Sequence, residues 1–348
     1  MEKMRKVLLI ISLLISLTAD VEAEGKQSFF KRLYKWYAAV DTNYVVPQKY
    51  PFTAMMQVTE NFDNIYIKDD VGHSLRMAPN NSIKVGPYFG YDFLFVGYQF
   101  SPFERYKRNN QDLNLNFYIA VGGIDLYWKR NSNRFRFQGL KMNGHDVDNL
   151  NGQYFDGLNH STYGLNLYYL FNHKKYSHRV TYAQVTQQKR SAGSFSLGLG
   201  YNIQEADLDY DKLYSQMRES GVPPEYMADT TRHKFNLKYH YLSVLGGYGY
   251  NFVLRENLVF NATGQLALGY IHYLRMNVNS SDDYLDNLNL DGIKKFKFDG
   301  TIRLGLAWCT QKYFIGSSAV FRCYTFDISS FNMNNYYTTV NIYAGIHF

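Results

Sequence analysis

The chain closes with VNIYAGIHF, residues 340–348, in which apolar and more polar side chains alternate. A period of two is the pattern of a β-strand that has one apolar face and one wetter face. The last residue, Phe348, is itself aromatic, and a final strand that ends on Phe is typical of bacterial outer-membrane barrels. We therefore expect a terminal barrel strand in which Tyr343, Ile346 and Phe348 are recognised by the barrel-assembly machinery.

The same alternation recurs along most of the chain. Between residues 296 and 308, Phe, Ile, Leu and Trp alternate with Lys, Asp, Thr and Arg. A soluble sandwich also alternates, but its outer face is richly charged, whereas here the polar faces hold mainly Ser, Thr, Asn and Gly, as a lumen does. Strands are predicted at residues 82–91, 92–101, 112–129, 133–140, 162–171, 177–186, 192–202, 233–252, 257–275, 295–309, 312–326 and 336–348. The predicted fold is all-β, a transmembrane antiparallel up-and-down β-barrel of about twelve strands with a short N-terminal periplasmic segment.

Two segments precede the predicted barrel, which we assign to residues 52–348. Residues 1–23 combine a basic start, a short apolar middle and small residues before Glu24, as a secretory signal peptide does. Their apolar run is too short for a spanning helix, which needs ~20 residues. Residues 24–51 follow as a periplasmic segment, in which 28–40 is either an amphipathic helix or a partly ordered leader. Three short pieces within 52–77 are assigned to a small meander at the barrel entry.

Composition supports an envelope protein. The chain has 33 Tyr and 25 Phe, and aromatic residues make up 18% of it, more than a soluble core needs. Transmembrane barrels use such residues as girdles at the two lipid–water interfaces. The net charge of +7 is spread along the chain, which favours contact with outer-membrane lipid, lipopolysaccharide or small anionic solutes. Nucleic acid is not expected as a partner, because it would require a clustered basic face.

Strand directions follow from counting back from the C-terminus. Residues 253–256 and 310–311 become short periplasmic turns, and residues 204–232, 276–294 and 327–335 become outer loops. Residues 141–161 do not fit, because this long span falls on the periplasmic side. A change of phase near Tyr241 indicates a β-bulge in that strand. Cys309 and Cys323 are predicted to be free thiols, since they lie ~36 Å apart along a hairpin and on opposite faces.

Catalytic, metal and cofactor sites are not expected. The nine His residues are scattered, and the glycine pairs lie within strands, where no nucleotide loop forms. By alternation His240, Asp299 and Ser318 face inward, but a triad needs a geometry that sequence does not show.

The most suggestive cluster is basic, and alternation points its members into the lumen, four of them near the outer mouth. They are Lys234, Lys238, Lys295, Lys297, Arg303 and Arg322. One hypothesis is an electropositive vestibule that attracts anionic solutes or contacts lipopolysaccharide phosphates. The alternative is a neutralised lumen, in which Asp299 and acidic loop residues pair with these cations.

Several motifs resemble one known family. They are DTNYV (41–45) with PQKY (47–50), SIKVGPYFG (82–90), YLFN (169–172) and SAGSF (191–195). Together they are similar to the family described as domain of unknown function 4421, over roughly residues 40–348. The resemblance implies an outer-membrane β-barrel of a Gram-negative bacterium, and it brings no catalytic residues.

Three functional hypotheses follow. The first is a narrow solute channel or an envelope ligand-binding barrel. The second is a structural or surface-interaction barrel that contacts envelope components through its long outer loops. The third, a lipid-modifying barrel enzyme, has the least support. A barrel of about twelve strands is largely filled by its own side chains, because open aqueous channels belong to wider barrels.

Overall fold

The computed structural model divides the chain into two compact units, Met1–Ala39 and Val40–Phe348. It describes residues 40–69, 72–79, 82–91, 94–102, 111–132, 135–227, 233–278, 285–286, 295–328 and 331–348. The predicted signal peptide and nearly all of the predicted amphipathic helix therefore lie outside the described residues. All that follows concerns the second unit.

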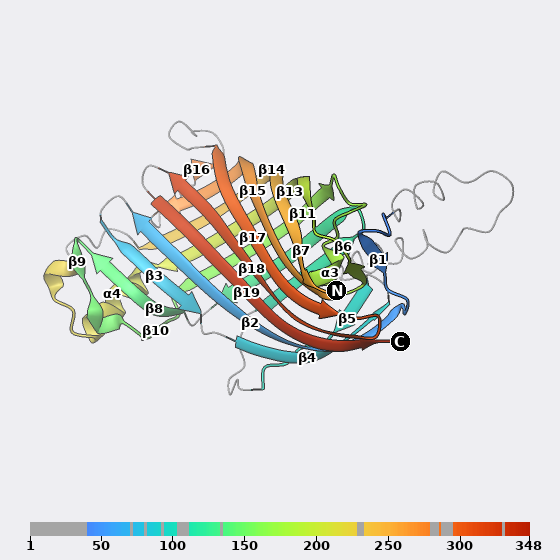
Figure 1. The fold of residues 1–348 in the computed structure, drawn as a ribbon. Coiled ribbons are helices and arrows are strands. Elements are labelled where there is room, and N and C mark those ends of the chain that lie inside the picture. The colour runs from blue at the N-terminus through green and yellow to red at the C-terminus, as the bar shows by residue number, and fades with distance from the viewer. Residues whose placement is uncertain are drawn as a thin grey trace, which may run out of the picture. The chain divides into compact units, whose positions relative to one another are not determined.

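This unit is built from long antiparallel strands (Figure 1). Their registers follow one another in the series β6 (Gln111–Ile119), β7 (Gly122–Ser132), β11 (Leu158–Leu170), β13 (Ala192–Asp209), β14 (Lys234–Arg255), β15 (Leu258–Val278), β17 (Phe296–Cys309), β18 (Tyr313–Ile328), β19 (Phe331–His347), β2 (Phe52–Asp69), β4 (Ser82–Tyr91) and β5 (Leu94–Gly97). The remaining elements are short: β1 (Val45–Pro47), β3 (Ser74–Pro79), β8 (Phe135–Met142), β9 (His145–Asp146), β10 (Tyr154–Phe155), β12 (Thr186–Gln188), β16 (Leu285–Asp286), α3 (Arg179–Tyr182), α4 (Tyr210–Glu219), η1 (Asp148–Leu150) and η2 (Pro224–Met227). The all-β class is as predicted.

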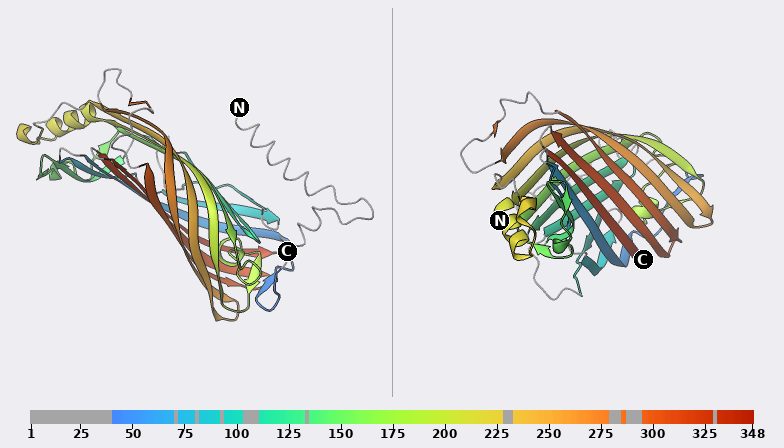
Figure 2. Two further views of the ribbon diagram at one scale, coloured as in Figure 1. Left: turned by 90° about the horizontal axis from the view of Figure 1, so that it is seen from above. Right: turned by 90° about the vertical axis from the view of Figure 1, so that its left-hand side faces the viewer.

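The long strands curve around a common interior (Figure 2). Along β17, Phe296, Phe298 and Ile302 are exposed, while Lys297, Asp299 and Arg303 are buried. Over much of their length β13, β15 and β19 alternate in the same way, and there their apolar residues lie on the exposed face, as predicted. Over this part the sheet turns apolar side chains outward and polar side chains inward, the reverse of a soluble protein.

Several predicted strands are wrong. Of the three short pieces predicted within 52–77, the first two belong to one continuous strand, β2, which pairs with β19 and β4 in the main wall. Residues 112–129 are two strands, β6 and β7, joined by a tight turn at Ala120-Val121. Residues 177–186 contain the helix α3 and no long strand.

The two ends of the sheet differ. The turn end, defined by the connections at 120–121, 256–257 and 310–312, is compact, and Asn257 adopts the left-handed φ of 65° that such turns require. The C-terminus lies at this end, where Phe348 and Phe52 bond each other's backbones. The opposite, far end carries β3, β8, β9, β10 and α4 (Figure 1). Because β6 and β7 are separate strands, residues 141–161 lie at the far end, and the count from the C-terminus that placed them at the turn end is wrong by one strand.

The far-end elements enclose an apolar core of their own. α4 begins at Asp209, whose side chain caps the helix by accepting from the Lys212 N–H at 3.1 Å. Its buried residues Tyr210, Leu213, Tyr214 and Met217 follow the i, i+3, i+4, i+7 spacing of one helix face. They join Phe135 and Phe137 of β8 and the inward residues Phe235, Leu237 and Tyr239 of β14. We call this assembly the far-end module.

Of the remaining predictions, one is confirmed and one is wrong. Cys309 and Cys323 are free, the first buried on the inner face and the second on the outer face, as predicted. The connection between β18 and β19 spans only residues 329–330, so the long loop predicted at 327–335 is wrong. No helix among the described residues is long and apolar enough to cross a membrane.

Candidate functional site in the lumen

The middle of the lumen is a layer of buried ion pairs. Lys129 Nζ lies 2.5 Å from Asp63 Oδ2, and Lys297 Nζ lies 3.0 Å from Asp299 Oδ1. Arg303 donates to Asp125 and to Gln265. The side chains of Arg303 and Asp125 are 2% and 1% exposed. These inward charges are therefore enclosed and neutralised in pairs. Removing one member of such a pair destabilises the fold strongly, because it leaves a buried charge without a partner.

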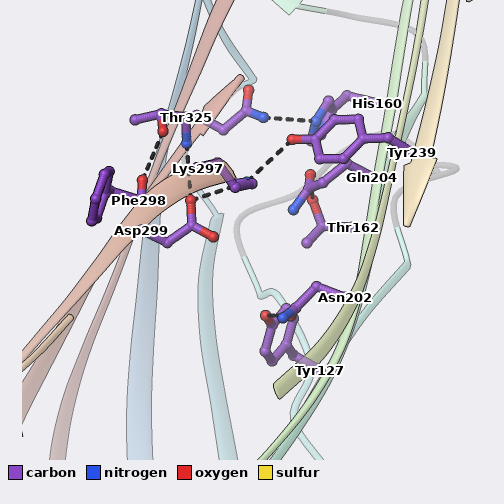
Figure 3. Close-up of polar contacts among 11 residues, drawn as sticks. Tyr127, His160, Thr162, Asn202, Gln204, Tyr239, Lys297, Phe298, Asp299 and Thr325 are labelled. Atoms are coloured by element: carbon purple, nitrogen blue, oxygen red, sulfur yellow. Dashed lines mark hydrogen bonds and ion pairs between the residues drawn. The ribbon is translucent and has the colours of Figure 1, made fainter. Parts of the chain in front are cut away.

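Tyrosine rings surround these cations. Lys297 Nζ lies 4.0 Å from the centroid of the Tyr241 ring and 5.1 Å from that of Tyr239. Figure 3 shows Lys297 directed towards Asp299 and the Tyr239 hydroxyl. Arg322 stacks over Tyr127 at 5.3 Å, and Arg303 lies 5.6 Å from the Tyr168 ring. Cation–π contacts of this kind stabilise desolvated cations without adding negative charge.

A second polar network borders the far-end core, because His160 is paired in register with Ala206, a residue of that core. Figure 3 shows its residues His160, Thr162 and Gln204. His160 contacts the Tyr337 hydroxyl at 2.9 Å and Asn335 at 3.1 Å. Thr162 donates to Gln204 at 2.7 Å and contacts Tyr337 at 3.0 Å. All five side chains are buried, so the network fixes the interior where polar lumen meets apolar core.

The predicted basic vestibule does not gather in one place. Lys297, Arg303 and Arg322 are buried and face inward, as expected from alternation. Lys234 and Lys238 lie on the outer face, where Lys238 pairs with Glu205 at 2.6 Å, so their predicted inward orientation is wrong. Lys295 is exposed just before β17.

The position of the bulge explains the error. β14 keeps its odd-numbered residues inward along its length, from Phe235 to Asn251. The register shift opposite His240 and Tyr241 places the additional residue, His272, in β15. The predicted bulge was therefore in the right place but in the wrong strand. In the part of β14 nearest the far end, the apolar odd-numbered residues face the far-end core. The side chains of Lys234, Lys238 and His240 therefore point outward.

The turn end of the lumen is filled by residues 171–191, which we call the plug. α3 contacts β6, β15, β17 and β18 from inside. The Tyr182 hydroxyl donates to Asn261 at 2.7 Å, and the Tyr343 hydroxyl donates to the Thr181 carbonyl at 2.6 Å. β12 of the plug also pairs with β1. The plug is thus fixed to the wall by side chains of several strands.

His178 sits in the plug within a cage of tyrosines. The rings of Tyr118, Tyr168, Tyr176 and Tyr182 lie 5.0 to 6.0 Å from its ring centroid, all edge-on or steeply inclined. Its Nε2 contacts Thr263 at 3.3 Å. Burial, and to a smaller extent the nearby Arg303 charge, lower the pKa of His178 to about 3.

This shift predicts a pH dependence. The native pKa lies below the unfolded value of 6.5, so the contribution of His178 to stability is constant above pH 6.5 and declines as the pH falls towards 3. At pH 5 the wild-type chain should have lost roughly 2 kcal/mol relative to a His178→Gln variant, compared with pH 7.5. Denaturant unfolding at both pH values measures the difference. Equal losses in the two proteins would contradict the assigned role of His178.

Other chemistry is not supported by the geometry. His240 lies on the outer face, hydrogen-bonded to the Tyr201 hydroxyl at 2.8 Å, whereas Asp299 and Ser318 face inward. The three candidate residues for catalysis are therefore not brought together. In the described part of the chain, no group of three or more His, Cys, Asp or Glu is placed to hold a metal ion.

Sequence reasoning missed Asp63, Asp125 and the tyrosine cage. Asp125 lies between Ile124 and Leu126, and this alternation indicates an inward carboxylate once residues 112–129 are divided into two strands. No sequence signal pairs it with Arg303, which is 178 residues away.

Comparisons with known proteins place the chain in one family. No curated protein matches it. Among solved structures it resembles the outer membrane protease OmpT from Escherichia coli, at 6% identity and a TM-score of 0.40, over 85% of this chain and 96% of that chain. It also resembles the translocator domain of the autotransporter NalP from Neisseria meningitidis, at 8% identity and a TM-score of 0.30, over 91% of this chain and 94% of that chain. Likenesses at this level carry no functional conclusion. The model of the domain of unknown function DUF4421 matches residues 39–348, and the chain belongs to that family.

Proposed function

We propose that the protein is an outer-membrane β-barrel of a Gram-negative bacterium, exported by the signal peptide of residues 1–23 and closed between β5 and β6 into about twelve strands. The exposed apolar face supports this proposal. Leu266 is 70% exposed, Phe298 67% and Leu199 66%, and each belongs to a continuous apolar face. Exposed apolar patches on soluble monomers rarely exceed a few hundred Å². Lipid is the environment that suits this surface.

Two adjacent rows of residues mark the boundary of the lipid-facing band on the side of the far end. Trp128, Tyr163, His240 and Tyr273 share one register row on the outer face, and Trp128 stacks on Tyr163 at 5.9 Å. The next row towards the far end carries Arg130, Glu205, Lys238 and Arg275. An aromatic row bordered by charges is typical of a lipid–water interface, and it favours contact of the charged row with lipid headgroups.

The width of the band agrees with this boundary. Between this aromatic row and the turn end, the outward residues of β14 run from Leu242 to Phe252. Ten residue-to-residue steps of ~3.3 Å each, tilted by ~40°, span ~25 Å along the membrane normal. Outer-membrane barrels present an apolar band of about this height. The far-end module then lies beyond the membrane, in contact with water.

We infer further that the barrel is filled and acts as a structural or surface-interaction protein, with the far-end module as its interaction surface. The single observation that carries this is the burial of the lumen: Arg303, Asp125, His178 and Asn261 are each at most 1% exposed. The outer surface of the module is polar, with half-exposed pairs such as Lys212–Asp156 and His233–Asp211. A narrow channel for anionic solutes has less support, because the cations meant to attract them lie on different faces.

Conductance tests this inference. The purified full chain in planar bilayers should give no current above the lipid baseline, because buried side chains leave no continuous aqueous path. Insertion is checked separately, by protection of the transmembrane strands from protease in vesicles. Steady unitary currents would contradict a filled barrel, and a preference for anions among them would restore the channel hypothesis.

A further inference from the structure

One inward cation differs from the others. The residue Arg322 in β18 is 7% exposed, and its Nη2 is enclosed with no hydrogen-bond partner among the described residues. In register it lies between Thr301 of β17 and Tyr337 of β19. Among the described residues, the ring against which its guanidinium stacks is that of Tyr127, at 5.3 Å. The guanidinium therefore has an aromatic face beside it and no carboxylate.

The neighbouring carboxylates are engaged by other cations. Asp63 pairs with Lys129, Asp125 with Arg303, and Asp299 with Lys297. Asp299 Oδ1 also accepts from the Thr325 N–H at 3.1 Å. Each pair is neutral, so the positive charge of Arg322 is left over within this group of residues.

An enclosed unpaired charge is unfavourable enough that it acquires a counter-ion or a proton change. Arginine cannot lose its proton in a protein. The tyrosines Tyr127, Tyr324 and Tyr337, which cluster around this position, offer hydroxyl groups and ring edges but no negative charge. A mobile anion from solution is the remaining way to compensate the charge.

We propose that Arg322 holds a small monovalent inorganic anion of the halide class inside the barrel. A single negative charge balances the single cation, and the enclosure favours an anion that is small and easily dehydrated. The guanidinium donors bind it directly, and the ring of Tyr127 fixes the plane of the guanidinium. This site does not depend on whether the barrel conducts ions or contacts a partner.

The test compares anions at constant ionic strength. The purified full chain in detergent micelles is heated in sodium chloride, sodium bromide or sodium gluconate, and the unfolding midpoint is recorded. Chloride or bromide at tenfold excess over its dissociation constant should raise the midpoint by about 2 °C over gluconate, because only the native state binds it. An Arg322→Met variant should show the same midpoint in all three salts.

A matched control removes a cation that is exposed on the outer face. Lys234→Met should keep the full response to halide. If gluconate and chloride give the same wild-type midpoint, ordered water satisfies Arg322 and the proposal is wrong. A halide response that persists in Arg322→Met also overturns it. If Arg322→Met does not fold, bromide located by anomalous scattering in wild-type crystals decides: a peak within hydrogen-bond distance of the guanidinium supports the site, and none there refutes it.

Discussion

Replacing Asp125 with Ala should lower the free energy of unfolding by about 3–5 kcal/mol, the largest effect expected of any substitution considered for this protein. The carboxylate is the partner of Arg303, and both side chains are almost fully enclosed. Removing it leaves a guanidinium that can neither reach water nor lose its proton. Denaturant unfolding of the refolded chain in detergent micelles measures the loss.

Two controls separate charge from packing. The double variant Asp125→Ala/Arg303→Met should recover most of the lost stability, because an apolar pair carries no desolvation penalty. Asp146→Ala should cost less than ~1 kcal/mol, since its partner Lys141 is 3.8 Å away and both side chains are largely exposed. If Asp125→Ala unfolds within 1 kcal/mol of the wild type, the ion pair is not the constraint described here.

The alternating pattern predicted the outward faces correctly where one side of a strand meets polar lumen. In β17 and in residues 260–270 of β15 the apolar rows are exposed and the polar rows are buried, as a period of two requires. The alternation alone does not show whether an apolar row faces the outside of the sheet or an apolar core on its inner side. Upper β14 has the same alternation, yet its row of Phe235, Leu237 and Tyr239 is buried in the far-end core. For that reason the predicted inward orientation of Lys234 and Lys238 is wrong.

Turns and the plug were harder to predict, because their signals are local and weak. The β6–β7 turn at Ala120-Val121 holds no Pro or Asn, and the neighbouring Gly122 is the remaining cue. A Cβ on Gly122 would lie 1.9 Å from the Tyr168 carbonyl oxygen, so only glycine fits there. The plug residues 177–186 alternate like a strand, but their backbone is helical in part, and the carbonyls of Ser177 and Thr181 accept hydrogen bonds from side chains of the surrounding wall.

The lumen contacts depend on the curvature of the sheet around a common interior, which no local pattern encodes. Arg303 and Asp125 come from β17 and β7, and Lys129 and Asp63 come from β7 and β2. These strands are not neighbours in register, so each pair forms across the interior. The sequence could show which residues face inward, but only the three-dimensional arrangement shows which of them meet.

Replacing Leu266 with Arg should destabilise the barrel by about 2–4 kcal/mol, because Leu266 projects from the middle of the proposed lipid-facing band. In a soluble protein, a change at a side chain 70% exposed to water would be nearly neutral, within ~0.5 kcal/mol. The two environments therefore give opposite expectations for one substitution. Unfolding in phospholipid vesicles measures the cost.

The matched control lies beyond the charged row of the same wall. Asn236 is exposed on the outer face of β14, towards the far end, so Asn236→Arg should cost close to nothing in the same vesicles. Since both variants add one arginine to an exposed strand position, the difference between them isolates the effect of lipid. Equal costs, together with a mature chain that stays monomeric in detergent-free buffer, would mean that water covers the apolar face and that the membrane assignment is wrong.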